Sequence, residues 1–288
     1  MSPEEMQRRV LYRDGLMLVV DKPAGQAVHP GPKGGPSLLD YFDALRFGLP
    51  RAPGLAHRLD RDTSGCLVLG RHRKALAHLG ALFRHGRVRK LYWAVVEGGP
   101  DADGGRIDLP LGRLDVTRGW WMKPDPHGQP AVTTWRVLGR NPSPAGGGSP
   151  RSGGVGGGSS REETPPPGSP GPSPGSPPSP ASRGRDKRIW LALEPLTGRT
   201  HQLRVHCAAM GWPVVGDGIY GTAPRTGGPP LHLHAREVAV PLYPKRDAVR
   251  VVAPVPAHMR QALTACGWNG EDVAIAEESA PALSTAAP

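Results

Sequence analysis

His57-Arg58-Leu59-Asp60-Arg61-Asp62-Thr63-Ser64-Gly65 runs directly into the apolar segment Cys66-Leu67-Val68-Leu69. The small polar residues at the end of the first stretch predict a turn, and the apolar segment predicts a buried strand. Asp60 lies two residues after Arg58, so an extended backbone places both side chains on one face. A carboxylate just ahead of a buried strand is expected to lie in a cleft. The plain alternative is an aspartate held by a salt bridge on a loop.

A second polar cluster spans residues 197–206, with the sequence TGRTHQLRVH. It predicts a helix that Thr200 caps and that runs to about Met210, with Thr200 and Arg204 on one face. The turn at Gly198 and the start of this helix are expected to suit a phosphate group. An amphipathic helix with a solvated basic side is an equally good interpretation of Arg204.

A third cluster, RKLYWAVVEG at residues 89–98, predicts a strand. Alternation along it places Tyr92, Ala94 and Val96 on the same face. Spacing alone favours a tyrosine in the core whose hydroxyl finds a local partner.

Strands and helices are expected to alternate irregularly along the chain, which favours an α+β fold with a mixed sheet. A hairpin is predicted at residues 10–21, because Asp14-Gly15 suits a tight turn between its two strands. The other expected strands are residues 66–69, 91–96, 132–138, 189–193, 231–240 and 249–255. The expected helices are residues 37–47, 73–85, 200–210 and 257–266.

The domain organisation follows from composition. Residues 141–182 are mostly Gly, Pro and Ser, so this insert is expected to be disordered because it cannot bury enough apolar surface. One domain is expected to comprise residues 10–140 and 183–268. Residues 1–9 are expected to form an N-terminal extension, and residues 269–288 a disordered tail.

The chain carries 36 Lys and Arg against 25 Asp and Glu, a net charge of +11, which favours a polyanionic partner. Nucleic acid is the first candidate for this partner and an acidic membrane surface the second. The three cysteines show no CxxC spacing, so neither a zinc ribbon nor a disulfide framework is indicated. An acidic N-terminus without an apolar signal region predicts a cytoplasmic protein, and no apolar stretch is long enough to span a membrane.

The three clusters together resemble the RluA-type family of RNA pseudouridine synthases. The resemblance also takes in LVVDKPAG at residues 18–25, GWPVVGD at 211–217 and LHLHA at 231–235. It extends from about residue 10 to residue 256, interrupted by the insert. It implies a pseudouridine-synthase fold, in which a mixed, largely antiparallel central sheet is flanked by helices and loops and crossed by a catalytic cleft. The N-terminal S4-type module of many relatives is expected to be absent.

The resemblance implies roles for individual residues. Asp60 matches the catalytic aspartate, Tyr92 the tyrosine that packs on the target uracil and is a candidate for proton removal, and Arg204 the basic residue that pairs with the aspartate. An arginine fork is expected to fix the orientation of that carboxylate. The residues expected to bind RNA or the uridine are Arg58, His57, Thr63, Leu203, Arg199 and His201, with Arg58 entering the stack that the base leaves.

The implied reaction breaks the N1–C1′ bond of a flipped-out uridine and rejoins the uracil through C5. No metal or organic cofactor is expected. Whether Asp60 attacks C1′, attacks C6 or removes a C2′ proton stays open. The expected partner is RNA, either tRNA or 23S rRNA, with no membrane contact, and the protein is expected to be a monomer.

Three other functions compete with this interpretation. The first is a non-catalytic RNA-binding protein on the same fold. The second is a zinc hydrolase built on His201, His206, His232 and His234, which the five-residue spacing of the first pair and the absence of HExxH argue against. The third is a glycosidase using Asp60 and Asp62, although two carboxylates on one short loop rarely flank a sugar from both sides.

Overall fold

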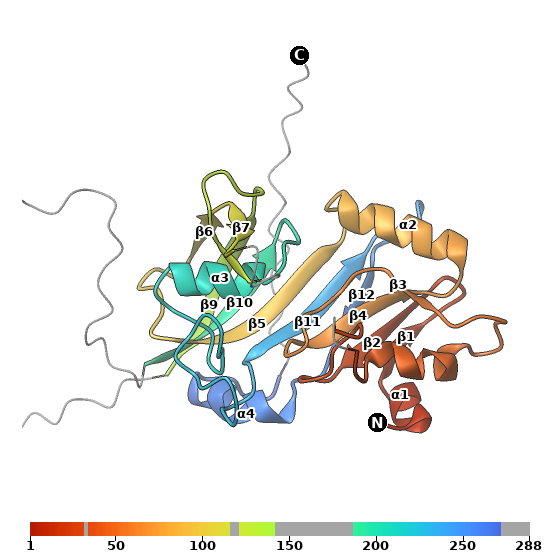
Figure 1. Cartoon of the computed structure of the whole chain (residues 1–288), viewed down its shortest axis with the longest axis horizontal. Helices are drawn as coiled ribbons and strands as arrows, with labels where there is room; N and C mark the ends of the chain where they lie inside the picture. The colour runs from red at the N-terminus through yellow and green to blue at the C-terminus, as the bar shows by residue number, and fades with distance from the viewer. Residues whose placement is uncertain (32–33, 116–120, 142–186, 272–288) are drawn as a thin grey trace, which may run out of the picture.

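The computed structural model describes residues 1–31, 34–115, 121–141 and 187–271. One ten-stranded sheet has the strand order β1-β2-β4-β11-β5-β10-β9-β6, with β3 beside β4 and β12 beside β11 (Figure 1). The strands are β1 (Val10–Arg13), β2 (Met17–Lys22), β3 (Gly54–Leu55), β4 (Ser64–Gly70), β5 (Arg89–Glu97), β6 (Gly104–Asp108), β7 (Leu111–Arg113), β8 (Met122–Pro124), β9 (Val132–Arg140), β10 (Arg188–Pro195), β11 (Leu233–Val240) and β12 (Val249–Val252). The helices are α1 (Pro3–Arg8), the 3₁₀ helix η1 (Leu38–Leu45), α2 (Arg73–Arg84), α3 (Gln202–Ala209) and α4 (Ala257–Ala265).

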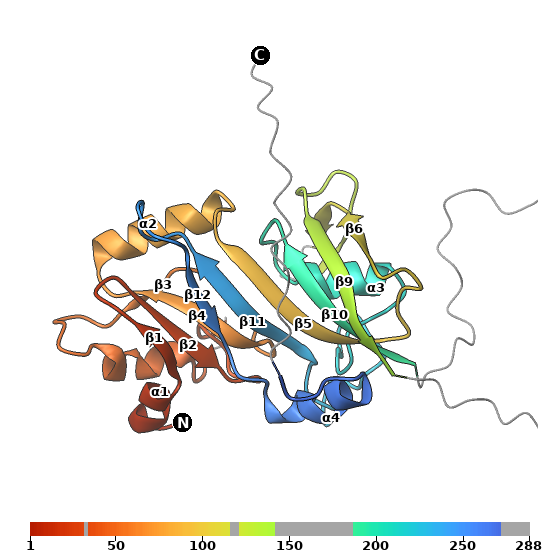
Figure 2. The ribbon, with the colours of Figure 1, turned by 180° about the vertical axis from the view of Figure 1, so that it is seen from behind.

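The pairing confirms the predicted α+β fold with a mixed, largely antiparallel sheet. Strand β11 pairs in parallel with β4 and antiparallel with β5 and β12, and the other described pairs of this sheet are antiparallel. Seen from behind, β9, β10, β5 and β11 run side by side (Figure 2). The separate pair β7–β8 lies outside this sheet.

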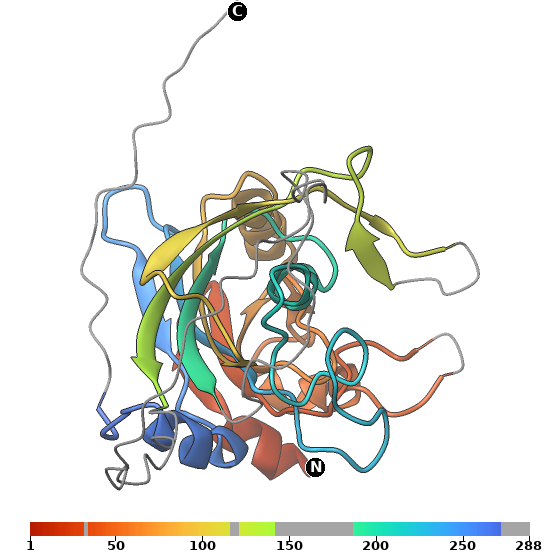
Figure 3. The ribbon, with the colours of Figure 1, turned by 90° about the vertical axis from the view of Figure 1, so that its left-hand side faces the viewer.

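Helices α3 and α4 lie on opposite faces of the sheet (Figure 3). The alternation of β5 explains this arrangement, because successive side chains of a strand point to opposite faces. Ala94 and Val96 share a cluster with Leu203 of α3, whereas Trp93 shares one with Met259 of α4. Both faces of β5 are therefore buried.

Tyr92 lies where two apolar clusters of one face meet. It packs against the cluster that includes Leu203 of α3 and also against the cluster that includes Phe42 of η1. Both clusters reach the middle of the sheet, through Leu233 and Ala235 of β11. The junction between these two halves is where the cleft opens.

The parallel contact between β4 and β11 requires a glycine. Gly65 has φ of +105° and pairs with Ala235, and a Cβ at this position would overlap the Ala235 carbonyl. Only glycine combines this backbone conformation with so close an approach. The turn that follows Asp60 is thereby joined directly to the centre of the sheet.

Several sequence predictions need correction. The helix expected to start at a Thr200 cap begins at Gln202, because His201 takes the N-cap position in a left-handed conformation with φ of 53°. The segment expected to be a helix over residues 37–47 is a shorter 3₁₀ helix. Strand β11 begins two residues later than predicted, and β12 ends at Val252 rather than at residue 255.

Some elements were not predicted at all. Residues 1–9, set apart as an extension, contain α1, whose Met6 is buried in the core beside η1. Its start carries a capping box between Ser2 and Glu5. The predictions for the insert, residues 141–182, and for the C-terminal tail, residues 269–288, fall almost entirely outside the described residues, which exclude 142–186 and 272–288.

Candidate active site

A cleft of about 650 Å³ opens beside the loop that carries Asp60. Four segments line it: the loop of residues 57–63, the end of α2, the start of β5, and residues 195–204, which lead from β10 into α3. Leu233 of β11 also contributes. The three polar clusters of the sequence, which are far apart along the chain, therefore meet in one place.

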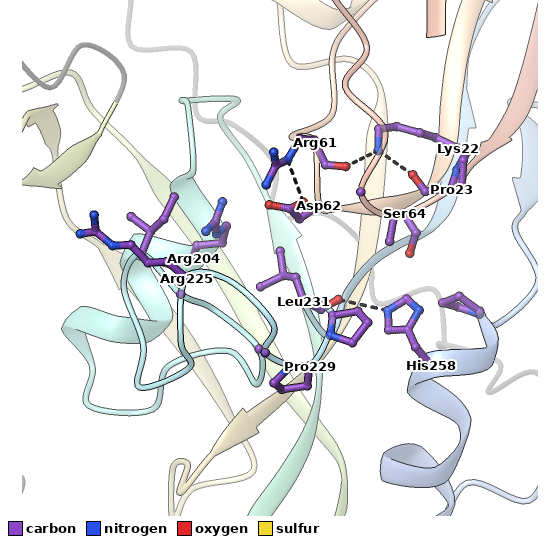
Figure 4. Close-up of a pocket in the computed structure, with 18 of the residues that line it drawn as sticks. Lys22, Pro23, Arg61, Asp62, Ser64, Arg204, Arg225, Pro229, Leu231 and His258 are labelled. Carbon is purple, nitrogen blue, oxygen red and sulfur yellow. Dashed lines mark hydrogen bonds and ion pairs between the residues drawn. The ribbon is translucent and has the colours of Figure 1, made fainter. Parts of the chain in front are cut away.

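Lys22 holds the loop that carries Asp60 in place. Its side chain is fully buried, and Nζ donates hydrogen bonds of 2.8 Å to the carbonyls of Pro23 and Arg61 (Figure 4). A third hydrogen bond of 2.8 Å reaches the Thr63 carbonyl. Burial lowers the pKa of Lys22 to about 7, against the charges of nearby aspartates. Three carbonyl acceptors match the three donors of an ammonium group, so Lys22 holds the loop most firmly in its charged form.

The Asp60 carboxylate faces the cleft and is partly open to solvent, with 19% of its side chain exposed. Oδ2 lies 3.8 Å from Nη1 of Arg204 and 3.8 Å from Nε2 of His201. The backbone N–H of Thr63 donates to the Asp60 carbonyl at 3.2 Å, which closes the turn. The carboxylate is thus set in a positive field and keeps room for a substrate.

Arg204 does not hold Asp60 in a fork. Its Nε and Nη2 donate instead to the two carboxylate oxygens of Asp217, each at 2.7 Å. Asp217 also accepts the backbone N–H groups of Ile219 and Tyr220. Burial would raise the pKa of Asp217, but these donors, above all Arg204, hold it below its ordinary value. Arg204 therefore forms the expected pair of hydrogen bonds with Asp217 and not with Asp60. Only its Nη1 approaches Asp60, at 3.8 Å.

Replacing Asp217 by asparagine is expected to lower the free energy of unfolding by about 3 kcal/mol, because it removes the negative charge that the buried Arg204 guanidinium binds through two hydrogen bonds. The folded pKa of Asp217 is depressed, so its contribution is present above the pKa of the unfolded chain and is lost as pH falls through the folded value. Urea unfolding at pH 7 and at pH 3 measures both effects. A variant as stable as the wild type at pH 7 would contradict this account of the pair.

His201 links Asp60 to Tyr220. Its Nδ1 lies 2.8 Å from the Tyr220 hydroxyl, which also accepts the backbone N–H of Met122. Burial lowers the pKa of His201, although the charge of Asp60 opposes this effect. Burial likewise raises the pKa of Tyr220, so the phenol keeps its proton and donates it to Nδ1. This assignment places the imidazole proton on Nε2, toward Asp60.

Tyr92 lines the cleft from β5. Burial raises its pKa, and the charge of Asp60 acts in the same direction. Tyr92 is therefore a neutral phenol at physiological pH. It offers an aromatic surface and a hydrogen-bond donor, and it is a poor base in this state.

Asp60 is the only carboxylate among the described residues that line the cleft. Lys90 projects from β5 two residues before Tyr92, and its Nζ donates to the Thr197 carbonyl at 3.2 Å. Burial lowers the pKa of Lys90 to about 8. The cationic side chains of the lining are Arg58, Arg84, Lys90, Arg199 and Arg204. Such a lining favours a polyanion that approaches a single reactive carboxylate.

The remaining predicted residues also line the cleft, but with different surroundings. Arg58 and Arg199 are exposed at its mouth, whereas Thr63 and Leu203 are buried in its wall. The ring of His57 stacks on Phe83, and its Nε2 accepts the backbone N–H of Val68 at 3.0 Å. Burial lowers the pKa of His57 to about 3, so this ring is neutral and holds the loop against β4.

Sequence reasoning gave no role to Lys22, Lys90, Asp217 or Tyr220. Lys22 and Asp217 belong to segments that carry the family resemblance, but their partners are distant in the chain. Lys22 binds carbonyls 39 and 41 residues away, and Asp217 binds a side chain 13 residues away. For Lys22, the available signal in the sequence was a lysine at the end of a predicted apolar strand.

The four histidines weighed as zinc ligands do not converge. The described residues contain no group of three or more His, Cys, Asp or Glu side chains able to hold a metal ion. His206 contacts Thr133, His232 contacts the Pro230 carbonyl, and His234 contacts Ser64. In the part of the chain that is described, no helix is long and apolar enough to cross a membrane.

Comparison with known proteins identifies the family. Residues 16–209 match the family model for RNA pseudouridylate synthase. An uncharacterized RNA pseudouridine synthase of Zymomonas mobilis is 35% identical over 253 residues, covering 87% of this chain and 95% of that protein. Ribosomal large subunit pseudouridine synthase C of Vibrio cholerae is 32% identical over 269 residues, covering 90% and 70%. The solved structure of human RNA pseudouridylate synthase domain containing 1 aligns with a TM-score of 0.63 at 26% identity, covering 92% and 89%.

Fold, cleft and relatives together define an RNA-modifying isomerase. The chain belongs to the RluA-type family of RNA pseudouridine synthases, which convert uridine in RNA to pseudouridine. These findings favour the enzyme over a non-catalytic RNA-binding protein on the same fold.

Proposed function

We propose that the target uridine leaves its RNA stack and enters the 650 Å³ cleft, where Asp60 acts on it. The observation that carries this assignment is the position of Asp60 as the only carboxylate among the described lining residues, 3.8 Å from Arg204. A base buried in a duplex is out of reach of such a carboxylate, so flipping is required.

The other side chains have supporting roles in this proposal. Tyr92 packs against the uracil, and such stacking is worth about 1–3 kcal/mol per base, which offsets part of the cost of unstacking. Leu203 forms the apolar wall beside it. Arg58, exposed at the mouth, fills the gap that the base leaves, and Arg199 binds phosphate. Arg204 keeps Asp60 in a positive field, and the neutral ring of His201 directs its Nε2–H toward the carboxylate. His57 and Thr63 hold the loop.

In the overall reaction, the N1–C1′ bond breaks and a C5–C1′ bond forms. The hydrogen on C5 leaves as a proton, and N1 gains one, so no oxidant or reductant is consumed. A neutral Tyr92 and the Nε2 proton of His201 are donors in the cleft. The bond that Asp60 makes during this sequence stays open.

We further propose large-subunit ribosomal RNA as the substrate and a monomer as the active form. The support for the substrate is that two relatives, from Vibrio cholerae and Yersinia pestis, are named ribosomal large subunit pseudouridine synthases. Transfer RNA is the alternative that the same cationic cleft accommodates, because phosphate contacts carry no sequence information.

The substrate is tested with purified protein and unmodified transcripts of 23S rRNA and of the tRNA set. After carbodiimide treatment, reverse transcription stops at each pseudouridine and gives its position. We expect one or a few new stops in 23S rRNA and none in tRNA. New stops in tRNA alone would overturn the ribosomal proposal and leave the enzyme class intact.

A further inference from the structure

A second cavity, of about 790 Å³, lies on the other side of the Asp60 loop (Figure 4). We propose that it binds a nucleotide neighbouring the target uridine, with Arg225 and Arg61 on its phosphate and the apolar wall against its base. This inference rests on the proposed entry of the uridine into the first cleft.

The loop itself separates the two cavities. Arg58, Asp60 and Thr63 line the first, whereas Arg61 and Asp62 line the second. The side chain of Arg204 borders both, so the cavities adjoin behind the loop. An RNA strand that places one nucleotide in the first cavity therefore brings its neighbours to the rim of the second.

The charges of the second cavity suit a phosphate, because cationic side chains outnumber the two carboxylates of its lining, those of Asp21 and Asp62. Arg225 forms no ion pair with a carboxylate among the described residues, and its guanidinium lies 4.6 Å from the centroid of the Trp121 ring. Arg61 is paired with Asp62 at 3.1 Å, but 67% of the arginine side chain is exposed. An exposed pair of this kind is only weakly stabilising, so a phosphate can replace the aspartate as partner.

The walls of the second cavity suit a base and a ribose. One part of the lining is apolar and conformationally restricted, and it is formed by Pro23, Pro224, Pro229, Pro230, Leu231 and Pro256. Its volume lies within the range of about 300–1,000 Å³ usual for small-molecule sites. An aromatic ring beside arginines is a usual surface for single-stranded nucleic acid, and Trp121 with Arg225 provides one in this lining. An acidic peptide would use the arginines but would leave the position beside the reacting nucleotide unexplained.

The proposal is tested with fluorescein-labelled decauridylate, whose Kd is measured at several salt concentrations. Arg225→Ala is expected to reduce the slope of log K against log salt by about 0.7, the value for one phosphate contact on a single strand. The matched control is Arg246→Ala, since Arg246 also covers an aromatic ring, that of Tyr243, but lines neither cavity. The control is expected to keep the wild-type slope.

A second variant tests the space rather than the charge. Ala257 is exposed at the start of α4 and lines the cavity, so Ala257→Trp fills it without entering the core. This variant is expected to raise KM for the RNA substrate about tenfold, a change of about 1.4 kcal/mol, with a smaller effect on kcat. If both variants match the wild type in slope and KM while the wild type is active, the cavity proposal is wrong and the enzyme function stands. If the wild type converts no uridine but Arg225→Ala still reduces the slope, the cavity binds RNA as proposed and the proposed function is wrong.

Discussion

Asp60→Asn is expected to lower kcat at least about 10⁴-fold, because loss of a catalytic group that acts with its neighbours removes nearly all chemistry. The amide is nearly isosteric with the carboxylate, so the loop and its anchor to Lys22 are kept. The Kd for substrate RNA is expected to change less than about threefold, since most of the affinity comes from phosphate contacts. Fluorescence anisotropy measures the Kd, and carbodiimide mapping over time measures the rate.

The matched control is Asp62→Asn, two residues along the same loop. Asp62 pairs with Arg61 and lines the second cavity rather than the first cleft. Its replacement is expected to lower kcat less than about tenfold, because it acts at most on binding of a neighbouring nucleotide. If both variants lost activity to the same degree, the loop as a whole, and not Asp60, would be the sensitive element.

Lys22→Met is expected to lower the free energy of unfolding by about 3–5 kcal/mol, since it leaves three buried or partly buried carbonyls without their donor and each costs about 1–3 kcal/mol. Methionine keeps the length and the apolar stem of the side chain. Activity is expected to fall by at least about 10²-fold even at a temperature where the variant is folded, because a misplacement of about 1 Å at a catalytic group has this effect.

Urea unfolding measures the stability of this variant, and kcat is measured on the folded protein. Lys245→Met, on an exposed loop, is the control and is expected to stay within about 0.5 kcal/mol of the wild type. A Lys22→Met protein with wild-type kcat would show that the three carbonyl contacts do not position Asp60.

The central strands of the sheet were predictable because their local pattern and their burial agree, whereas β3 and β6 were not predicted. The run 66–69 and the alternation of β5 both lie in the centre of the sheet, where tertiary packing and sequence periodicity favour the same structure. The start of α3 was not predictable from propensity. A histidine in the left-handed conformation at the N-cap position is uncommon, and it is held here by contacts to Asp60 and Tyr220.

The residues that line the candidate site were predictable, but the contacts between their side chains were not. Asp60, Tyr92 and Arg204 do line one cleft, as the resemblance implied. The fork of Arg204 onto Asp217 and the anchoring of the loop by Lys22 depend on contacts between distant segments. Spacing along a sequence cannot rank such contacts, because it contains no information about which loops meet.

The most direct test of the central claim is the release of tritium from RNA labelled at C5 of uridine, measured under single-turnover conditions. Formation of the C5–C1′ bond expels the C5 hydrogen, so release reports the reaction itself. The wild type is expected to release one tritium for each uridine converted, and Asp60→Asn none above background. Release by Asp60→Asn at the wild-type rate would show that Asp60 does not carry the chemistry.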